Sequence, residues 1–86
     1  MSLFLIERNF AQPLELTQED LSRILRVEAE LGVRWIFSFL SSDKKKTYCI
    51  YRAPDAEALR EAARRLNEPA DVIKEVRCLG AEALPI

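Results

Sequence analysis

The sequence predicts an α+β domain of the ferredoxin-like type, in which a four-stranded antiparallel sheet carries two helices on one face. Three observations support this fold class. Strand-like and helix-like segments follow in the order βαββαβ, both helix-like segments have amphipathic spacing, and a short polar turn joins the middle pair of strands. Because 86 residues leave room for one hydrophobic core, we expect a single domain over residues 1–86.

The first strand and the first helix have clear sequence signals. Leu3–Phe10 is rich in large apolar residues, as is typical of a strand. Thr17 and Asp20 have the spacing of a capping box, and Gly32 is a typical helix stop, so a helix is predicted over Gln18–Leu31. Its mostly apolar stripe contains Leu21, Ile24, Leu25, Glu28 and Leu31.

The rest of the chain predicts a hairpin, a helix and a last strand. Val33–Ser41 and Lys46–Ala53 are strand-like runs around a polar turn. Asp55 is a candidate cap for a helix that ends near Asn67, and Asp71–Leu79 has the apolar density of a fourth strand. Right-handed crossovers then place both helices on the same face of the sheet.

Composition excludes several classes of function. Thirteen basic and fourteen acidic residues give a net charge of −1, so nucleic acid is not an expected partner, and we interpret Lys44–Lys46 as a solvated turn. Two cysteines without any histidine exclude a Cys/His zinc knuckle and a multi-disulfide scaffold. Neither a signal pattern nor a membrane-length apolar run is present, so we expect a cytoplasmic protein with reduced thiols and no membrane contact.

Alternation along the strands separates two rows of side chains. We expect one row to face the helices: Phe4, Ile6, Phe10, Ile36, Ser38, Leu40, Tyr48, Ile50, Val72, Val76 and Cys78, with Arg8 at its rim. We expect the other row on the open face: Leu3, Leu5, Glu7, Asn9, Val33, Trp35, Phe37, Phe39, Thr47, Cys49, Tyr51, Ile73, Glu75, Arg77 and Leu79. A slip of one residue would exchange the rows. The open face is too apolar for water, which predicts a homodimer through it.

Polar groups on this predicted open face have two interpretations. In the structural one, Glu7 or Glu75 pairs with Arg77, and Cys49 is a small buried hydrophobe. In the functional one, the face holds a shallow ligand or metal site, with residues drawn from Glu7, Trp35, Cys49, Tyr51, Glu75 and Arg77. A thiolate and a carboxylate are suitable ligands for a borderline divalent metal, although the chain lacks the histidine that such metals favour.

No catalytic residues are predicted. The chain has no histidine, no glycine-rich phosphate loop and no motif around a serine nucleophile. Hydrolase and nucleotide-dependent activities are therefore not expected.

Four segments resemble a bacterial family of small ferredoxin-like proteins of unassigned function, in which one member is described as nickel-responsive and nickel-binding. The segments are Phe4–Phe10, Leu31–Trp35, Thr47–Ala56 and Glu57–Ala63. The Glu7-Arg8 pair and the stretch from Cys49 to Pro54 are the most specific of these pieces. The resemblance implies the same fold and a divalent metal such as nickel, with Glu7 and Cys49 as ligands and Tyr51 as an orienting neighbour.

Three hypotheses about function follow, in this order. The first is a dimeric binding module for a metal ion or small ligand, and the second is a structural or regulatory interaction protein whose Glu7, Glu75 and Arg77 are all internally paired. The third is a small dimeric-barrel enzyme with Tyr51 or Glu7 as acid or base, which needs a pocket of about 300 Å³ or more, lined by Trp35 and Phe37. For the tail at Leu84–Ile86 two placements are considered: packing on the sheet edge or packing on a partner subunit.

Overall fold

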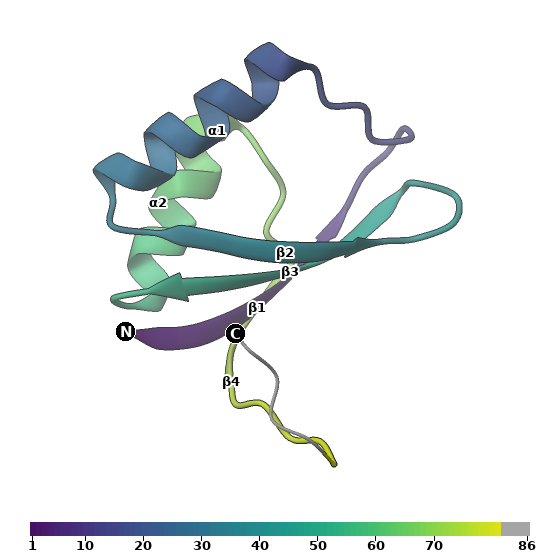
Figure 1. The fold of residues 1–86 in the computed structure, drawn as a ribbon. Helices are drawn as coiled ribbons and strands as arrows, with labels where there is room; N and C mark the ends of the chain where they lie inside the picture. Colours follow the sequence, from purple (N-terminus) through teal and green to yellow (C-terminus); the bar gives the residue numbers. More distant parts are fainter. Residues whose placement is uncertain (82–86) are drawn as a thin grey trace.

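The structure is a computed structural model that describes residues 1–81 of the chain. Within that range the elements follow the predicted order: β1 (Ser2–Asn9), α1 (Gln18–Glu30), β2 (Arg34–Leu40), β3 (Lys46–Ala53), α2 (Ala56–Leu66) and β4 (Val72–Val76). The strands form one antiparallel sheet in the order β2-β3-β1-β4, and both helices lie over the same face (Figure 1). This arrangement confirms the ferredoxin-like fold. The predicted tail contact lies outside the described residues.

The helix ends have the local chemistry that the sequence predicts. The hydroxyl of Thr17 accepts a hydrogen bond from the Asp20 backbone N–H at 3.1 Å, and the Asp20 carboxylate accepts one from the Thr17 N–H at 2.9 Å. This capping box satisfies donors that the first turn of α1 leaves free. The carboxylate of Asp55 caps α2 in the same way, by accepting from the Ala58 N–H at 2.9 Å. At the other end of α2, Asn67 adopts the left-handed conformation with φ of 53°.

The central strand β1 defines which side chains face the helices. Phe4 and Ile6 are buried as predicted, whereas Arg8, which was expected at the rim, is also buried with 4% of its surface exposed. Across the β1–β3 pairing, Phe4, Ile6 and Arg8 lie opposite Tyr51, Cys49 and Thr47 respectively. Side chains of directly paired residues share one face of the sheet, so the second triplet faces the helices too.

The predicted faces are therefore wrong for β3 and β4, and for the start of β2. On β3, Thr47, Cys49 and Tyr51 face the helices rather than the open side, because both rows of this strand are apolar and alternation does not separate them. On β4 the rows are exchanged in the same way: Ile73 pairs with Ile6 and packs on the core, so Val72 and Val76 face the open side.

The prediction for β2 is wrong only at the start of the strand, because Ser38 and Leu40 face the helices and Phe37 and Phe39 face the open side as predicted. The pairing shifts between Trp35 and Phe37, which leaves Ile36 without a direct partner and turns the side chain of Trp35 toward the helices. Val33, just before this strand, is likewise buried in the core instead of lying on the open face.

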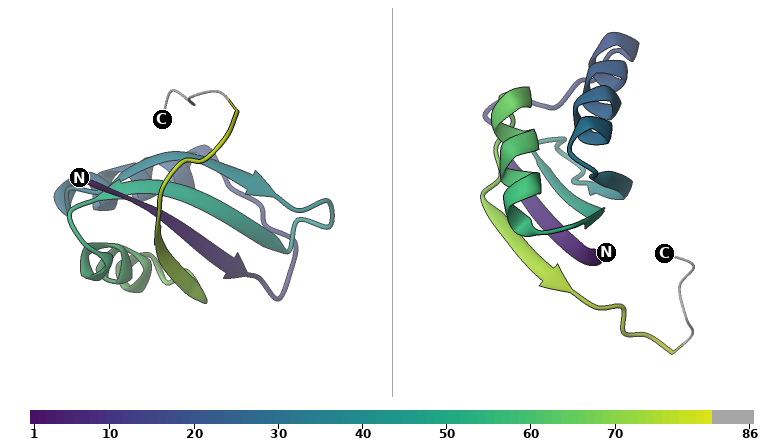
Figure 2. Two further views of the ribbon diagram at one scale, coloured as in Figure 1. Left: turned by 90° about the horizontal axis from the view of Figure 1, so that it is seen from below. Right: turned by 90° about the vertical axis from the view of Figure 1, so that its left-hand side faces the viewer.

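The last strand is shorter than predicted. Val76 pairs with Leu3, which is almost the first residue of β1, so a longer β4 would extend beyond its antiparallel partner. Residues 77–81 leave the sheet on the side away from the helices (Figures 1 and 2), and Cys78 is exposed instead of facing them.

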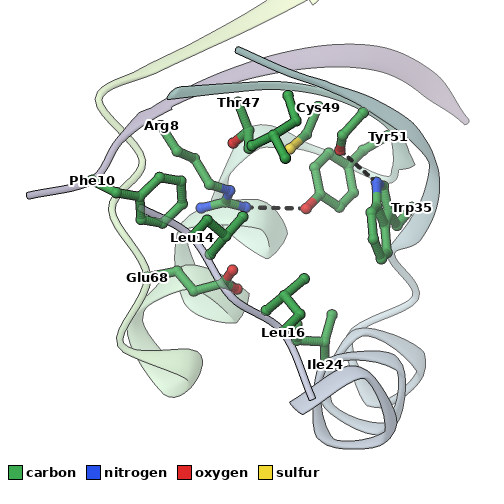
Figure 3. A pocket seen from close by; sticks show the side chains of 12 residues that line it. Arg8, Phe10, Leu14, Leu16, Ile24, Trp35, Thr47, Cys49, Tyr51 and Glu68 are labelled. Carbon is green, nitrogen blue, oxygen red and sulfur yellow. Dashed lines mark hydrogen bonds between the residues drawn. The ribbon is translucent and has the colours of Figure 1, made fainter. Parts of the chain in front are cut away.

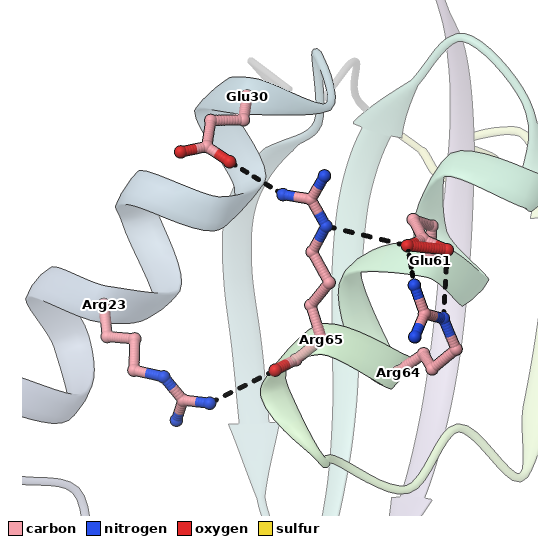
Figure 4. Close-up of polar contacts among 5 residues, drawn as sticks. All are labelled: Arg23, Glu30, Glu61, Arg64 and Arg65. Atoms are coloured by element: carbon pink, nitrogen blue, oxygen red, sulfur yellow. Dashed lines mark hydrogen bonds and ion pairs between the residues drawn. The ribbon is translucent and has the colours of Figure 1, made fainter.

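Exposed polar contacts join the two helices (Figure 4). Arg65 on α2 pairs with Glu30 on α1 at 2.7 Å and with Glu61 on its own helix at 3.6 Å. Arg64 also pairs with Glu61, and Arg23 donates to the backbone oxygen of Arg65 at 3.2 Å. Solvent and salt screen exposed pairs of this kind, so packing against the sheet remains the main attachment of the helices.

Within residues 1–81, no helix covers the opposite face of the sheet (Figure 2). This face carries a broad set of apolar side chains. They are Leu3, Leu5, Phe37, Phe39, Tyr48, Ile50, Val72 and Val76. Phe39 has 64% of its surface exposed, and its ring meets that of Phe37 edge-on with centroids 5.4 Å apart. Among residues 1–81, neither helix has the length and apolar character needed to cross a membrane.

Candidate functional site

A cavity of about 170 Å³ lies between the sheet and α1 (Figure 3). Its apolar wall consists of Phe10, Leu14, Leu16, Ile24, Trp35 and Leu40. Its polar wall consists of Arg8, Ser38, Thr47, Cys49, Tyr51 and Glu68. The cavity is thus mostly apolar, with a small group of polar side chains on β1, β2 and β3 and on the loop before β4.

The connection between β1 and α1 closes one side of the cavity. Its residues Phe10 and Leu14 donate backbone hydrogen bonds to the carbonyl oxygens of Lys45 and Lys44, at 2.8 and 2.7 Å. These bonds tie the connection to the β2–β3 turn, where Lys44 adopts a positive φ of 62°. The side chain of Leu16, from the same connection, completes this wall.

The buried guanidinium of Arg8 is the central polar group of the cavity. It donates to the backbone oxygen of Pro69 and, at 3.1 Å, to the hydroxyl oxygen of Tyr51 (Figure 3). Burial alone lowers the pKa of Arg8, but its interactions with Tyr51 and Glu68 outweigh burial and leave the pKa above its ordinary value. Arg8 is therefore a permanent positive charge in the wall.

Burial raises the pKa of Tyr51 well above its usual value, so its side chain stays a neutral phenol. The hydroxyl oxygen already accepts from Arg8, which leaves the hydroxyl proton available for a further acceptor. Tyr51 is 4% exposed and lines the cavity. It is thus positioned as a hydrogen-bond donor toward the interior.

Two carboxyl groups lie close enough to Arg8 to interact with its charge. Glu28, on α1, is only 3% exposed. Burial, and secondly the negative charge of Glu68, raise the pKa of Glu28 to about 7, against the opposing effect of Arg8. Burial also raises the pKa of Glu68, again against Arg8. When they are ionised, the two acids offset the positive charge of the guanidinium.

Two buried polar atoms in this region lack a hydrogen-bond partner among residues 1–81: Oε1 of Glu28 and Oγ1 of Thr47. Thr47 is 4% exposed and lines the cavity. A buried hydroxyl without a partner destabilises the folded protein. A bound group that forms a hydrogen bond with it therefore gains binding free energy.

Three of the six predicted ligand-binding residues meet in this cavity: Trp35, Cys49 and Tyr51. They lie on the helix-covered side rather than on the open face where the sequence placed them. The indole N–H of Trp35 donates to the Ser38 hydroxyl at 2.8 Å, which orients the ring along the wall. Cys49, 5% exposed, belongs to the hydrophobic core as well as to the cavity.

The structure does not bring the other three to the cavity. Glu7 lies on the open face, with its carboxylate 4.0 Å from the ammonium of Lys46. Glu75 and Arg77 are exposed, on and just after β4, and within residues 1–81 neither forms an ion pair. The complete internal pairing that the interaction-protein hypothesis requires is therefore not seen in this part of the chain.

The cavity also differs from the one that an enzyme of this fold was expected to need. Its volume is below the roughly 300 Å³ at which ordinary ligand pockets begin. Trp35 lines it as expected, but Phe37 lies on the opposite face of the sheet.

Residues 1–81 do not fit a nickel centre within one protomer. No three Asp, Glu, Cys or His side chains gather there in a way that would hold a metal ion. Glu7 and Cys49 point to opposite faces of the sheet, since Cys49 pairs directly with Ile6. A divalent metal with borderline preferences ordinarily needs three or four protein ligands of this kind.

Sequence reasoning missed the polar group around Arg8 as a site. Two signals were present. Arg8 is the charged residue in the otherwise apolar row of β1, and Glu28 is the charged residue in the apolar stripe of α1. Both rows face the same core, so the sequence indicates that the two charged side chains lie near each other. Glu68 and Thr47 have no comparable signal in the sequence.

Comparison with known proteins gives one family. A family model described as nickel responsive protein SCO4226-like matches residues 4–76. The crystal structure of SCO4226 from Streptomyces coelicolor A3(2) is similar to this chain with a TM-score of 0.69 and 20% sequence identity, over 92% of this chain and 100% of that one. At this identity the structural similarity shows the shared fold alone. No curated protein matches.

Proposed function

We propose a binding function for this chain, which belongs to the SCO4226-like family of nickel-responsive proteins. The family description names no organic ligand, so the geometry of the site decides the proposal. The chain is a binding module that takes up a small organic molecule in the cavity between the sheet and α1. The composition of the cavity wall supports this proposal, because apolar side chains surround the buried pair of Arg8 and Tyr51. Ligand sites typically combine an apolar lining with a few convergent polar groups.

The single tryptophan of the chain allows a direct test, because Trp35 lines the cavity. Titration with single-ring fragments at millimolar concentration is expected to shift or quench its emission. A cavity-filling variant, Cys49→Leu, is expected to abolish the response, while Ile50→Leu, on the opposite face of the same strand, is expected to retain it. If Cys49→Leu fails to fold, Leu16→Trp blocks the cavity from its exposed connection instead, with fragment-observed NMR as the readout. A wild-type protein that responds to no fragment contradicts the proposal.

A second copy of the chain is the partner that the open sheet face favours. Phe39 is exposed in a face with seven further apolar side chains, an arrangement that monomers rarely leave in water. Homodimerisation through this face would bury them around a twofold axis. Light scattering after size exclusion is expected to give a dimer for the wild type and a monomer for Phe39→Glu. Leu25→Glu, an equally apolar exposed site on α1, is the matched control and should stay dimeric. A monomeric wild type contradicts the dimer.

Binding of a divalent metal by Glu7 and Cys49 stays a prediction of the sequence. Isothermal titration with Ni²⁺ checks it on the wild type, Glu7→Ala and Cys49→Ala. Stoichiometric binding that both substitutions abolish would support the prediction. Because the two side chains lie on opposite faces of the sheet, the geometry favours no stoichiometric binding within one protomer.

A further inference from the structure

We propose that the cavity selects an uncharged, single-ring molecule with one hydroxyl group, of which phenol is the simplest, and that Thr47 recognises that hydroxyl. This inference rests on the proposed binding function and adds the class of ligand. The volume of the cavity, its hydrogen-bonding groups and its charge each limit which ligand fits.

Size limits the ligand to about one ring. The cavity has a volume of about 170 Å³. An apolar cavity of roughly 150 Å³ is known to hold benzene, so a ring with one small substituent fills this one. Its lining by Phe10, Ile24 and Trp35 provides aromatic and aliphatic contacts to such a ring.

Hydrogen bonding requires one polar substituent. Thr47 lines the cavity, and its buried Oγ1 has no hydrogen-bond partner in the described chain. The hydroxyl of Tyr51, which accepts from Arg8, keeps a proton to donate (Figure 3). A ligand hydroxyl both donates and accepts, so it can supply the partner that Thr47 lacks. A bare hydrocarbon ring would leave this buried atom unsatisfied.

Charge excludes an acid. Arg8 suggests a carboxylate ligand at first sight, but its guanidinium already donates to Pro69 and Tyr51 and interacts with the carboxyls of Glu28 and Glu68. A ligand carboxylate would add a third acid to one buried base. An ammonium would have to sit beside Arg8 itself. The neutral hydroxyl remains as the group that this wall stabilises.

The test compares phenol, benzoate and toluene by ¹⁵N-HSQC titration of the wild-type protein. We expect phenol to bind about 5-fold or more tightly than toluene, which is the effect of one net hydrogen bond, and also more tightly than benzoate. Benzoate binding as tightly as phenol, or more so, overturns the inference but leaves the binding function in place. Binding of none of the three overturns both.

Variants of Thr47 separate recognition from packing. The near-isosteric Thr47→Val is expected to lower the affinity for phenol toward that for toluene and to leave toluene binding unchanged. Thr47→Ser retains the hydroxyl and is expected to retain the preference for phenol. An unchanged ratio of phenol to toluene affinity in a folded Thr47→Val overturns the role of Thr47. If this variant does not fold, the ligand series on the wild type and on Thr47→Ser still decides between the outcomes.

Discussion

Replacement of Glu28 by glutamine is expected to change how the stability of the protein depends on pH. The buried carboxyl has its pKa raised from 4.5 to about 7, by burial first and by Glu68 second, with Arg8 opposing. A raised acid pKa means that the folded state binds more protons than the unfolded state between these values. The free energy of unfolding therefore falls as the pH rises through that window, and the loss is complete above about pH 7.

The size of this effect follows from the two pKa values. Between pH 5 and pH 8 one such group lowers the free energy of unfolding by about 2–3 kcal/mol. The phenol of Tyr51 stays neutral throughout, and Glu68 acts in the same direction as Glu28, so the substitution removes part of the total pH dependence. Glu28→Gln is neutral at every pH and is expected to be more stable than the wild type at pH 8.

Urea unfolding monitored by Trp35 fluorescence at pH 5, 6, 7 and 8 measures the effect. The matched control is Glu19→Gln, which removes an exposed carboxylate from the same helix and should follow the wild-type curve. If the stability difference between wild type and Glu28→Gln varies by less than about 0.5 kcal/mol over this range, Glu28 does not titrate with a raised pKa.

Three further predictions concern single contacts, each checked by urea unfolding. Tyr51→Phe should cost about 1–3 kcal/mol, because Arg8 loses a buried hydrogen-bond partner, and an unchanged stability would contradict that bond. Thr17→Ala should cost about 1 kcal/mol through loss of the capping box with Asp20, so a neutral substitution would argue against the cap. Asn67→Ala should cost about 1 kcal/mol at its left-handed φ, whereas Asn67→Gly should cost nothing; equal effects would exclude a conformational origin.

The order of elements was predictable because its signals are local. The capping box of Thr17 and Asp20 gave the start of α1 at the correct residue, and Asp55 marked the start of α2. Such signals depend on neighbours within one turn, so tertiary packing does not change them. The end of β4 depends instead on the length of its partner β1, which local sequence does not contain.

The faces of the strands were predictable only where one row differs from the other. In β1 the row of Phe4 and Ile6 is more apolar than the row of Glu7, and its orientation was correct. In β3 both rows contain apolar residues, so the sequence does not distinguish Cys49 from Ile50 as the buried one. The irregular pairing in β2 reverses the alternation and has no glycine or proline to signal it.

The errors in strand orientation moved the candidate site to the wrong side of the sheet. Trp35, Cys49 and Tyr51 were correctly grouped, because residues on paired strands move together when a row is reversed. Glu7 was grouped with them only through the same error. The charged residues Arg8 and Glu28 in otherwise apolar rows indicated the position of the site, since a charged residue in such a row lies either at a rim or in a buried polar group.

Intermolecular NOEs between phenol and the methyl-labelled protein locate the ligand on one side of the sheet. NOEs from the ring protons to the methyl groups of Leu14 and Ile24, which line the cavity, are expected. NOEs to Leu5 and Ile50 instead would place the ligand on the open face and contradict binding on the helix-covered side.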